Sequence, residues 1–241
     1  MTRIYVDQPL QTGVTLELPD GAARHVAQVL RMRPGQPLTL FNGLGGESSA
    51  VLSEVAKRRV EVEIGAHDPV ERESPLQVHL AQCVSKGDRM DWAIQKAVEL
   101  GVSRIIPVLS ERSVVKLTDE RWQKKLEHWR GVIIGACEQS GRTRLPDLWP
   151  TCSLPDYLRD EDAEHRWVLA PGADTGLPST GVQGSVAVLV GPEGVLSDRD
   201  LQQEETAGLQ RRSIGPRVLR TETAAAAILT ALQLRFGDLG D

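Results

Sequence analysis

Two short loops in the last quarter of the chain carry residues that could do chemistry. The first is Gly191-Pro192-Glu193-Gly194, and the second runs from Gly215 to Thr223 as GPRVLRTET. Each loop follows an apolar run, so each alone is explained by a tight turn between a strand and a helix. As a pair they favour a binding site, because bare backbone lets a flat heterocycle approach closely and exposed amides and carbonyls can read its edge.

The elements around these loops are expected to bring them together. Ser185–Val190 is short, rich in β-branched residues and followed by Gly-Pro, which predicts a buried strand. A second strand is expected at Leu209–Ile214, and an alanine-rich helix should follow it and end at Gly237. Ser197, with Asp200 three residues later, can cap the helix between them. Two successive strand–loop–helix units place both loops at the carboxyl ends of parallel strands, where α/β proteins bind ligands.

Other common kinds of active site are not supported. The histidines are scattered without HxH or HxxxH spacing, and no CxxC pair exists, so no metal is expected. The GxSxG motif of serine hydrolases and the GxxxxGK[ST] phosphate loop are both absent. Gly43-Leu44-Gly45-Gly46 does not match GxGxxG and precedes a predicted strand, which argues against a dinucleotide-binding loop.

The composition is that of an ordinary globular protein. Of its 241 residues, 40% are apolar and 25% are charged, and the net charge is −5. An acidic chain is not expected to coat nucleic acid non-specifically, so a polyanionic partner would be held by a local patch. The widely spaced cysteines suggest no disulfide framework, and neither a membrane-spanning run nor a signal peptide is recognisable. We therefore expect a cytoplasmic protein that does not engage a membrane.

The hydrophobic pattern changes near residue 70, which predicts two domains. Residues 1–70 are typical of a small β-rich domain with one helix, from Asp20 to Met32. Ala66–Pro75 is polar and proline-containing, and is the best candidate for a linker. In residues 71–241 strands alternate with helices, which indicates an α/β domain with a largely parallel sheet.

The predicted N-terminal helix carries Arg24, His25 and Arg31. The simpler interpretation is a solvated helix face. The functional interpretation is phosphate contact, since a small barrel with basic groups is a common RNA-binding design. The residues alone leave both possibilities open.

Several long motifs give the chain a family resemblance. They are VGPEGVLSDRD and IGPRVLRTETAAAAILTALQ, together with HVAQVLRMRPGQPLTLFNG, KGDRMDWAIQKAVELG and ACEQSGR. With these motifs the chain resembles the SPOUT superfamily of knotted methyltransferases, and specifically the family that methylates N3 of a uridine in bacterial 16S ribosomal RNA. The resemblance implies a PUA-like β-barrel followed by an α/β domain with a trefoil knot, a homodimer, and S-adenosylmethionine bound by the knot loops.

The resemblance also assigns residues to a cofactor pocket. By matching position these are Leu169, Pro171, Gly191, Glu193, Gly194, Ile214, Pro216, Leu219, Arg220 and Thr221. Leu169–Pro171 also ends a predicted strand, which independently agrees with the rim of a pocket. The family usually has a second glycine where this chain has Val195, and a β-branched residue would be strained there if the position needs a positive φ.

Methylation of N3 requires the loss of a proton from a uracil imide that is mostly protonated at neutral pH. An arginine can stabilise the anion that develops on the uracil oxygens, and we expect Arg220 to do so. Glu138 and Arg142, in the EQSGR stretch, are expected to orient the base or its phosphate. Glu222 is a further candidate, although its charge would also be favourable simply because it begins a helix. No general base is identified.

The expected substrate is a uridine in the decoding region of 16S ribosomal RNA, on the assembled small ribosomal subunit. The base must be splayed out of the folded RNA before N3 can be reached. Phosphate contacts are expected from Arg24, His25, Arg31, Lys86, Arg89 and Arg142. Two alternatives are an RNA-binding or ribosome-assembly factor that keeps the fold without methyl transfer, and a SPOUT enzyme that acts on transfer RNA ribose.

Overall fold

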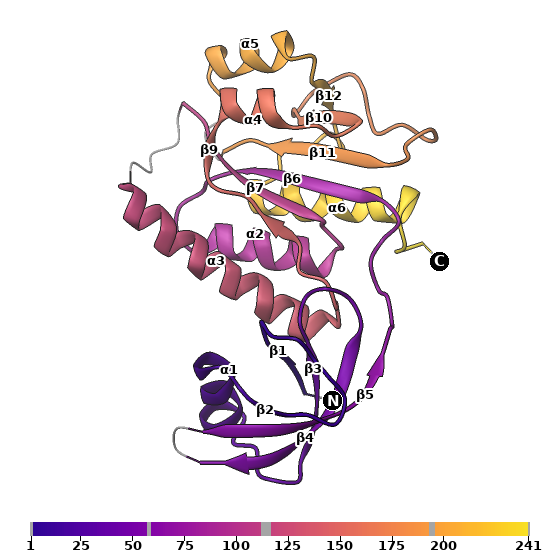
Figure 1. Ribbon diagram of the computed structural model, residues 1–241. Coiled ribbons are helices and arrows are strands. Elements are labelled where there is room, and N and C mark those ends of the chain that lie inside the picture. Colours follow the sequence, from indigo (N-terminus) through magenta and orange to yellow (C-terminus); the bar gives the residue numbers. More distant parts are fainter. Residues whose placement is uncertain (1, 57–58, 112–116, 193–195, 241) are drawn as a thin grey trace. The chain divides into compact units, whose positions relative to one another are not determined.

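The computed structural model describes residues 2–56, 59–111, 117–192 and 196–240. The chain divides into two compact units, which are both visible in Figure 1. Unit 1 consists of Met1–Glu73 and Cys137–Leu145, and unit 2 consists of Ser74–Ala136 and Pro146–Asp241. No sequence pattern indicated that Cys137–Leu145, from the middle of the chain, groups with the N-terminal unit.

Unit 1 is built on a five-stranded sheet with the strand order β1-β3-β4-β5-β2. β1 is parallel to β3, and the other neighbouring strands are antiparallel. The VEVEI stretch buries Val60, Val62 and Ile64 on one face, as the two-residue period of a strand requires. The strands are β1 (Arg3–Tyr5), β2 (Thr15–Glu17), β3 (Pro37–Phe41), β4 (Glu47–Val55) and β5 (Val60–Asp68). Because β5 continues to Asp68, the first residues of the predicted linker belong to a strand.

The helix predicted from Asp20 to Met32 is wrong in its second half. α1 spans only Asp20–Arg24, and a π-helix, η1 (His25–Val29), follows it. The wider turn is closed by the N–H of Leu30, which donates to the carbonyl of His25 over 2.9 Å. Arg31 then adopts a φ of 52°, a left-handed conformation that only a few per cent of non-glycine residues take up. Hydrophobic periodicity gives no signal for the π-helix or for the positive φ of Arg31.

Unit 2 contains a seven-stranded sheet in which the neighbouring strands are parallel. The strand order is β12-β10-β11-β6-β7-β8, and β9 also pairs with β7. The strands are β6 (Gln77–Cys83), β7 (Arg104–Leu109), β8 (Asp147–Leu148), β9 (Cys152–Ser153), β10 (His165–Leu169), β11 (Ser185–Val190) and β12 (Gln210–Arg212). The parallel α/β sheet was predicted, whereas the two-residue strands β8 and β9 are too short to leave a pattern.

Helices cover both faces of this sheet. They are α2 (Asp88–Glu99), α3 (Asp119–Ser140), α4 (Leu154–Asp160), α5 (Asp198–Thr206) and α6 (Thr221–Phe236). α2 and α6 pack together on one face, while α4 and α5 lie on the other (Figure 1). Ser197 and Asp200 form a complete capping box at the start of α5, and Gly237 caps the end of α6, as predicted. Within the described part of the chain, no helix combines the length and hydropathy of a membrane span.

Candidate cofactor and active site

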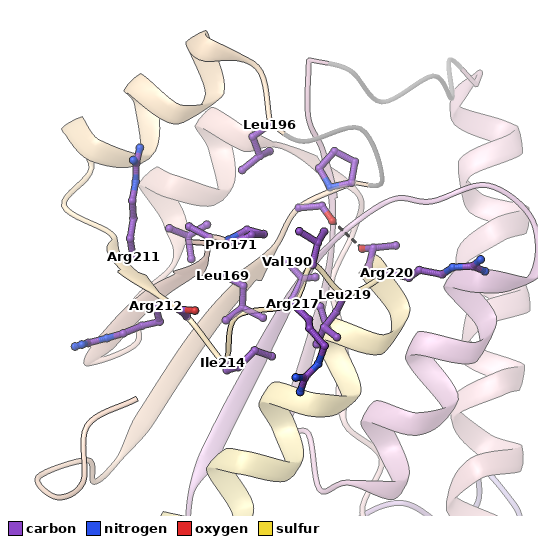
Figure 2. A pocket seen from close by; sticks show the side chains of 18 of the residues that line it. Leu169, Pro171, Val190, Leu196, Arg211, Arg212, Ile214, Arg217, Leu219 and Arg220 are labelled. Atoms are coloured by element: carbon purple, nitrogen blue, oxygen red, sulfur yellow. Dashed lines mark hydrogen bonds between the residues drawn. The ribbon is translucent and has the colours of Figure 1, made fainter. Parts of the chain in front are cut away.

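A cavity of about 600 Å³ lies in unit 2 where β10, β11 and β12 end, against the start of α6 (Figure 2). Its walls are residues 168–171, 190–192, 211–215 and 217–221, together with Leu196 and with side chains from α2, α5 and α6. The volume falls within the roughly 300–1,000 Å³ that is typical of small-molecule sites. The cavity therefore occupies the position that the two strand–loop–helix units predicted, at the carboxyl edge of a parallel sheet.

Most of the residues assigned to the cofactor pocket line this cavity. They are Leu169, Pro171, Gly191, Ile214, Leu219, Arg220 and Thr221. Pro216 does not appear in the described lining, although its neighbours Gly215 and Arg217 do. Glu193 and Gly194, and with them the unusual Val195, lie outside the described residues.

Ile214 reaches the cavity because β12 ends earlier than predicted, at Arg212. The Ser213 hydroxyl donates to the carbonyl of Gly215 over 3.1 Å and accepts from its N–H at 3.4 Å. Such local side-chain bonds compete with the strand ladder and turn the backbone out of the sheet. Gly215 has a φ of 129°, which a residue with a Cβ adopts only with strain. As a result Ser213 and Ile214, which were predicted to end the strand, lie outside it and line the cavity.

Apolar side chains that the sequence did not single out form the inner wall of the cavity. Val168, Val190, Leu196 and Leu201 all line it, and they come from β10, β11 and the region of α5. Val168 and Val190 stand at strand ends, so their position in the predicted strands was the available signal. An apolar wall beside exposed backbone suits a ligand with a flat heterocycle.

Glu204 of α5 is the unexpected polar group in this wall. Its side chain is almost fully buried, and neither carboxyl oxygen has a hydrogen-bond partner among the described residues. The pKa of Glu204 is raised to about 7, mainly by burial and also by Asp200, while Arg211 opposes the shift. Sequence reasoning missed Glu204 because it stands in an otherwise polar helix.

Arginines provide the remaining charged lining. Arg89, Arg211, Arg212, Arg217 and Arg220 all border the cavity. Figure 2 shows Arg211 and Arg212 on one side, and Arg217 and Arg220 on the side of α6. The guanidinium of Arg212 lies 5.2 Å from the ring centre of Trp167 and donates to the carbonyl of Gly176 over 3.2 Å. This lining favours an anionic ligand or substrate at the mouth of the cavity.

The two candidates in the RTET run are placed differently. Arg220 is the N-cap residue of α6 and is exposed at the cavity, and its side chain makes no capping hydrogen bond. Glu222 lies in the first turn of α6 but does not line the described cavity wall. One of its carboxyl oxygens is buried with no partner among the described residues. Only Arg220 is therefore positioned to meet a group bound in the cavity.

Comparison with known proteins shows the family. Residues 72–233 match the model of an RNA methyltransferase domain, and residues 18–65 match that of an RNA methyltransferase PUA domain. Ribosomal RNA small subunit methyltransferase E of Buchnera aphidicola subsp. Schizaphis graminum is 34% identical over 239 residues, which cover 98% of this chain and 97% of that protein. The chain belongs to the ribosomal RNA small subunit methyltransferase E family.

Solved structures agree with this assignment. A ribosomal RNA small subunit methyltransferase E from Neisseria gonorrhoeae, bound to S-adenosyl methionine, superimposes with a TM-score of 0.92 at 40% identity and covers 99% of both chains. A Legionella pneumophila protein in complex with bound SAM gives a TM-score of 0.95 at 43% identity, again over 99% of both chains. The predicted α/β fold with a PUA-like N-terminal domain is confirmed. The trefoil knot itself stays a prediction.

Glu138 and Arg142, the other candidates that the family resemblance suggested, belong to unit 1. Oε1 of Glu138 accepts a hydrogen bond from the backbone N–H of Tyr5 at 2.9 Å, and burial raises the pKa of its carboxyl. Arg142 is buried, and its Nε donates to Oε1 of Glu73 over 3.0 Å. Neither residue lines the cavity of unit 2 in the described structure. Both residues thus have partners within unit 1, and the expectation that they orient the base or its phosphate stays a prediction.

The remaining basic candidates lie in both units. In unit 1, Arg24 and Arg31 are exposed and His25 is half-buried in the π-helix. In unit 2, Lys86 and Arg89 are exposed at the start of α2, and Arg89 also lines the cavity. Their accessibility is compatible with phosphate contact, which no contact in this structure tests.

One group of potential metal ligands comes together among the described residues, although none was expected. It consists of His79, Glu161 and Asp162. Nδ1 of His79 is 2.8 Å from Oε1 of Glu161, and the guanidinium of Arg104 donates to Asp162 over 3.1 Å. Arg104 pairs with Asp162 and also lies 3.9 Å from Glu161, so the arrangement is explained as a partly buried ion-pair network. Sequence spacing could not reveal it, since His79 is far from the other two residues in the chain.

Proposed function

We propose that this chain is an S-adenosylmethionine-dependent methyltransferase that modifies N3 of a uridine in 16S ribosomal RNA. The substrate we propose is the decoding region on the assembled small subunit. The observation that carries the proposal is the cavity, which gathers most of the matched cofactor residues at one edge of the sheet. Family membership and the cofactor in the Neisseria and Legionella structures support it.

The residues of the cavity fit S-adenosylmethionine. Leu169, Ile214 and Leu219 supply apolar surface for the faces of an adenine ring, next to backbone groups that can read its edge. Gly215 lets the chain turn there, at a φ that a residue with a Cβ would adopt only with strain. When bound, the cofactor supplies an electrophilic methyl group on a sulfonium. The walls of the cavity therefore need only hold and orient the cofactor.

The charged residues at the mouth act on the RNA. We assign Arg220 to the uracil oxygens, where its positive charge stabilises the anion that forms as N3 loses its proton. Arg89 and Arg217 are placed to hold phosphates and so to position the nucleotide. Glu222 is kept as a further catalytic candidate, and no residue is assigned as the general base.

The proposed partners follow from charge and family. The net charge of −5 favours local contacts over strong binding of naked RNA, which supports the assembled subunit as substrate. On unit 1 we assign phosphate contacts to Arg24 and Arg31, which are exposed. A homodimer in the cytoplasm is the arrangement that the family resemblance implies, and light scattering of the purified protein would test the dimer.

The test is methyl transfer to ribosomal particles. Small subunits and naked 16S ribosomal RNA from cells that lack this protein would be incubated with labelled S-adenosylmethionine, and the product mapped by mass spectrometry. We expect one methyl group, on the base of a uridine in the decoding region and mainly in the particles. A methyl on ribose would indicate the transfer RNA ribose class of chemistry. Binding of particles without transfer would indicate an assembly factor.

A further inference from the structure

Gln82, at the end of β6, is a buried amide that does not belong to the described cavity wall. Its Nε2 donates to the carbonyl of Cys83 over 3.2 Å and to Oγ1 of Thr221 over 2.8 Å. A carbonyl can only accept, so the nitrogen of the amide must face Cys83. Both hydrogens of Nε2 are then used, and Thr221 is the acceptor in the second bond.

This polarity determines what the hydroxyl of Thr221 does. Because its oxygen accepts from Gln82, its single hydrogen is directed elsewhere. It points to the carbonyl oxygen of Gly191, 2.7 Å away (dashed in Figure 2). The three residues form a relay with one direction, from Gln82 through Thr221 to Gly191. The relay joins β6, the first residue of α6 and the end of β11.

The last residue of the relay, Gly191, lies at the cavity. Gly191 and Thr221 both line it, one from the loop after β11 and the other from the start of α6. Gly191 has no side chain to hold its loop, and the bond from Thr221 to its carbonyl restrains this peptide. The hydroxyl of Thr221 accepts from Gln82 and gives its one hydrogen to Gly191, so it has no donor left for a ligand. Its contribution to the site is therefore to fix the two walls relative to each other.

We propose that Gln82 is a positioning residue for S-adenosylmethionine, which it serves by fixing Gly191 through Thr221. The inference rests on the proposed function and adds a residue that does not itself reach the cofactor. Oε1 of Gln82 is buried and has no hydrogen-bond partner in the described structure. An unpaired buried carbonyl is unfavourable for stability, so the amide is better explained by what its N–H groups hold than by folding.

The test is calorimetric binding of S-adenosylmethionine to wild type and matched variants. Thr221→Val removes the hydroxyl at nearly constant shape, and Gln82→Met removes both donors. Each should weaken binding about tenfold, as the loss of one net hydrogen bond predicts. Thr221→Ser keeps the hydroxyl and should stay within about twofold of wild type. The control is Thr230→Val, which removes a hydroxyl that donates within α6 to the carbonyl of Ala226, and which should leave binding unchanged.

The double variant separates a relay from two independent contacts. Gln82→Met with Thr221→Val should lose the same factor of about ten as either single change, because the relay has one output. Thermal unfolding without cofactor, and kcat against KM for S-adenosylmethionine, would be measured in parallel. We expect similar Tm values and an effect confined to KM.

Three results would overturn the relay: wild-type affinity in Thr221→Val, a loss in Thr221→Ser equal to that in Thr221→Val, or multiplied losses in the double variant. If Thr221→Val does not fold, Gln82→Glu gives the same information. Its carboxylate accepts from Thr221 and so draws the hydroxyl hydrogen away from Gly191, which should again weaken binding. Failure of the wild type to bind S-adenosylmethionine would instead refute the proposed function.

Discussion

The backbone N–H of Tyr5 donates a hydrogen bond to Oε1 of Glu138 over 2.9 Å, across 133 residues of sequence. Tyr5 ends β1 of the N-terminal sheet, and Glu138 lies in the last turn of α3. Arg142, just after α3, is likewise buried against Glu73. These bonds explain why Cys137–Leu145 groups with unit 1, and they give Glu138 a structural task that can be measured.

Replacement of Glu138 tests that task. Glu138→Ala removes the acceptor of the Tyr5 N–H and should lower the free energy of unfolding by about 1–3 kcal/mol. Glu138→Gln keeps a side-chain oxygen at the same place and should recover most of that loss. Chemical denaturation measures both, with Gln139→Ala at the exposed neighbouring position as control. Equal destabilisation by Gln and Ala would mean that the charge, and not the acceptor, is what matters.

Glu204 should make stability depend on pH. Burial raises its pKa from the ordinary 4.5 to about 7, so between these values the folded protein holds a proton that the unfolded chain releases. Stability must therefore fall as pH rises through this window and then stay level. Among the described residues, the carboxyl of Glu204 interacts with three charged or titratable groups. They are Arg211 of β12, Asp200 of α5 and the thiol of Cys83 in β6.

Glu204→Gln removes the titrating group and should flatten this dependence. Relative to wild type, the variant should gain up to about 3 kcal/mol between about pH 5 and pH 8. Urea denaturation at several pH values gives the difference, and Glu205→Gln, at the exposed neighbour, should reproduce the wild-type curve. Parallel curves for wild type and Glu204→Gln would show that Glu204 is ionised normally in the folded state.

Arg31 carries both strain and charge. Arg31→Gly should raise the free energy of unfolding by about 1 kcal/mol, since glycine accepts the φ of 52° without a Cβ clash. The same change removes a proposed phosphate contact, so RNA binding should weaken and its salt dependence should drop by about one ion. Arg31→Lys keeps charge and strain and is the control. Destabilisation by glycine would show that packing of the Arg31 side chain outweighs the strain.

Arg220 should matter far more for methyl transfer than for cofactor binding. Arg220→Ala should reduce kcat by about 10²–10³, the usual effect of removing one group that stabilises a developing anion. Its side chain makes no capping bond, so α6 should keep its stability. Single-turnover methylation measures the rate, calorimetry the affinity for S-adenosylmethionine, and Arg220→Lys tests how far charge alone suffices. Unchanged turnover would remove Arg220 from the mechanism.

Local patterns determined a large part of the site. Ser185–Val190 with its Gly-Pro end, the capping box of Ser197 and Asp200, and the position of Leu169 at the end of a strand could all be predicted. These features depend on hydrogen bonds and hydrophobic periods within a few residues, which the sequence displays directly. The residues from Gly215 to Thr221 are consecutive in the sequence, so a single motif identified them together.

Only the tertiary structure decided which distant groups meet. Glu138 bonds Tyr5 across 133 residues and Gln82 bonds Thr221 across 139, and no spacing in the chain encodes either contact. The burial of Glu204 and the π-helix at His25–Val29 likewise arise from packing, which overrides the preferences of the local segment. Strand order and helix placement bring such groups together. The sequence by itself therefore determined the two loops of the site, and the fold decided which distant side chains complete its walls and hold them in place.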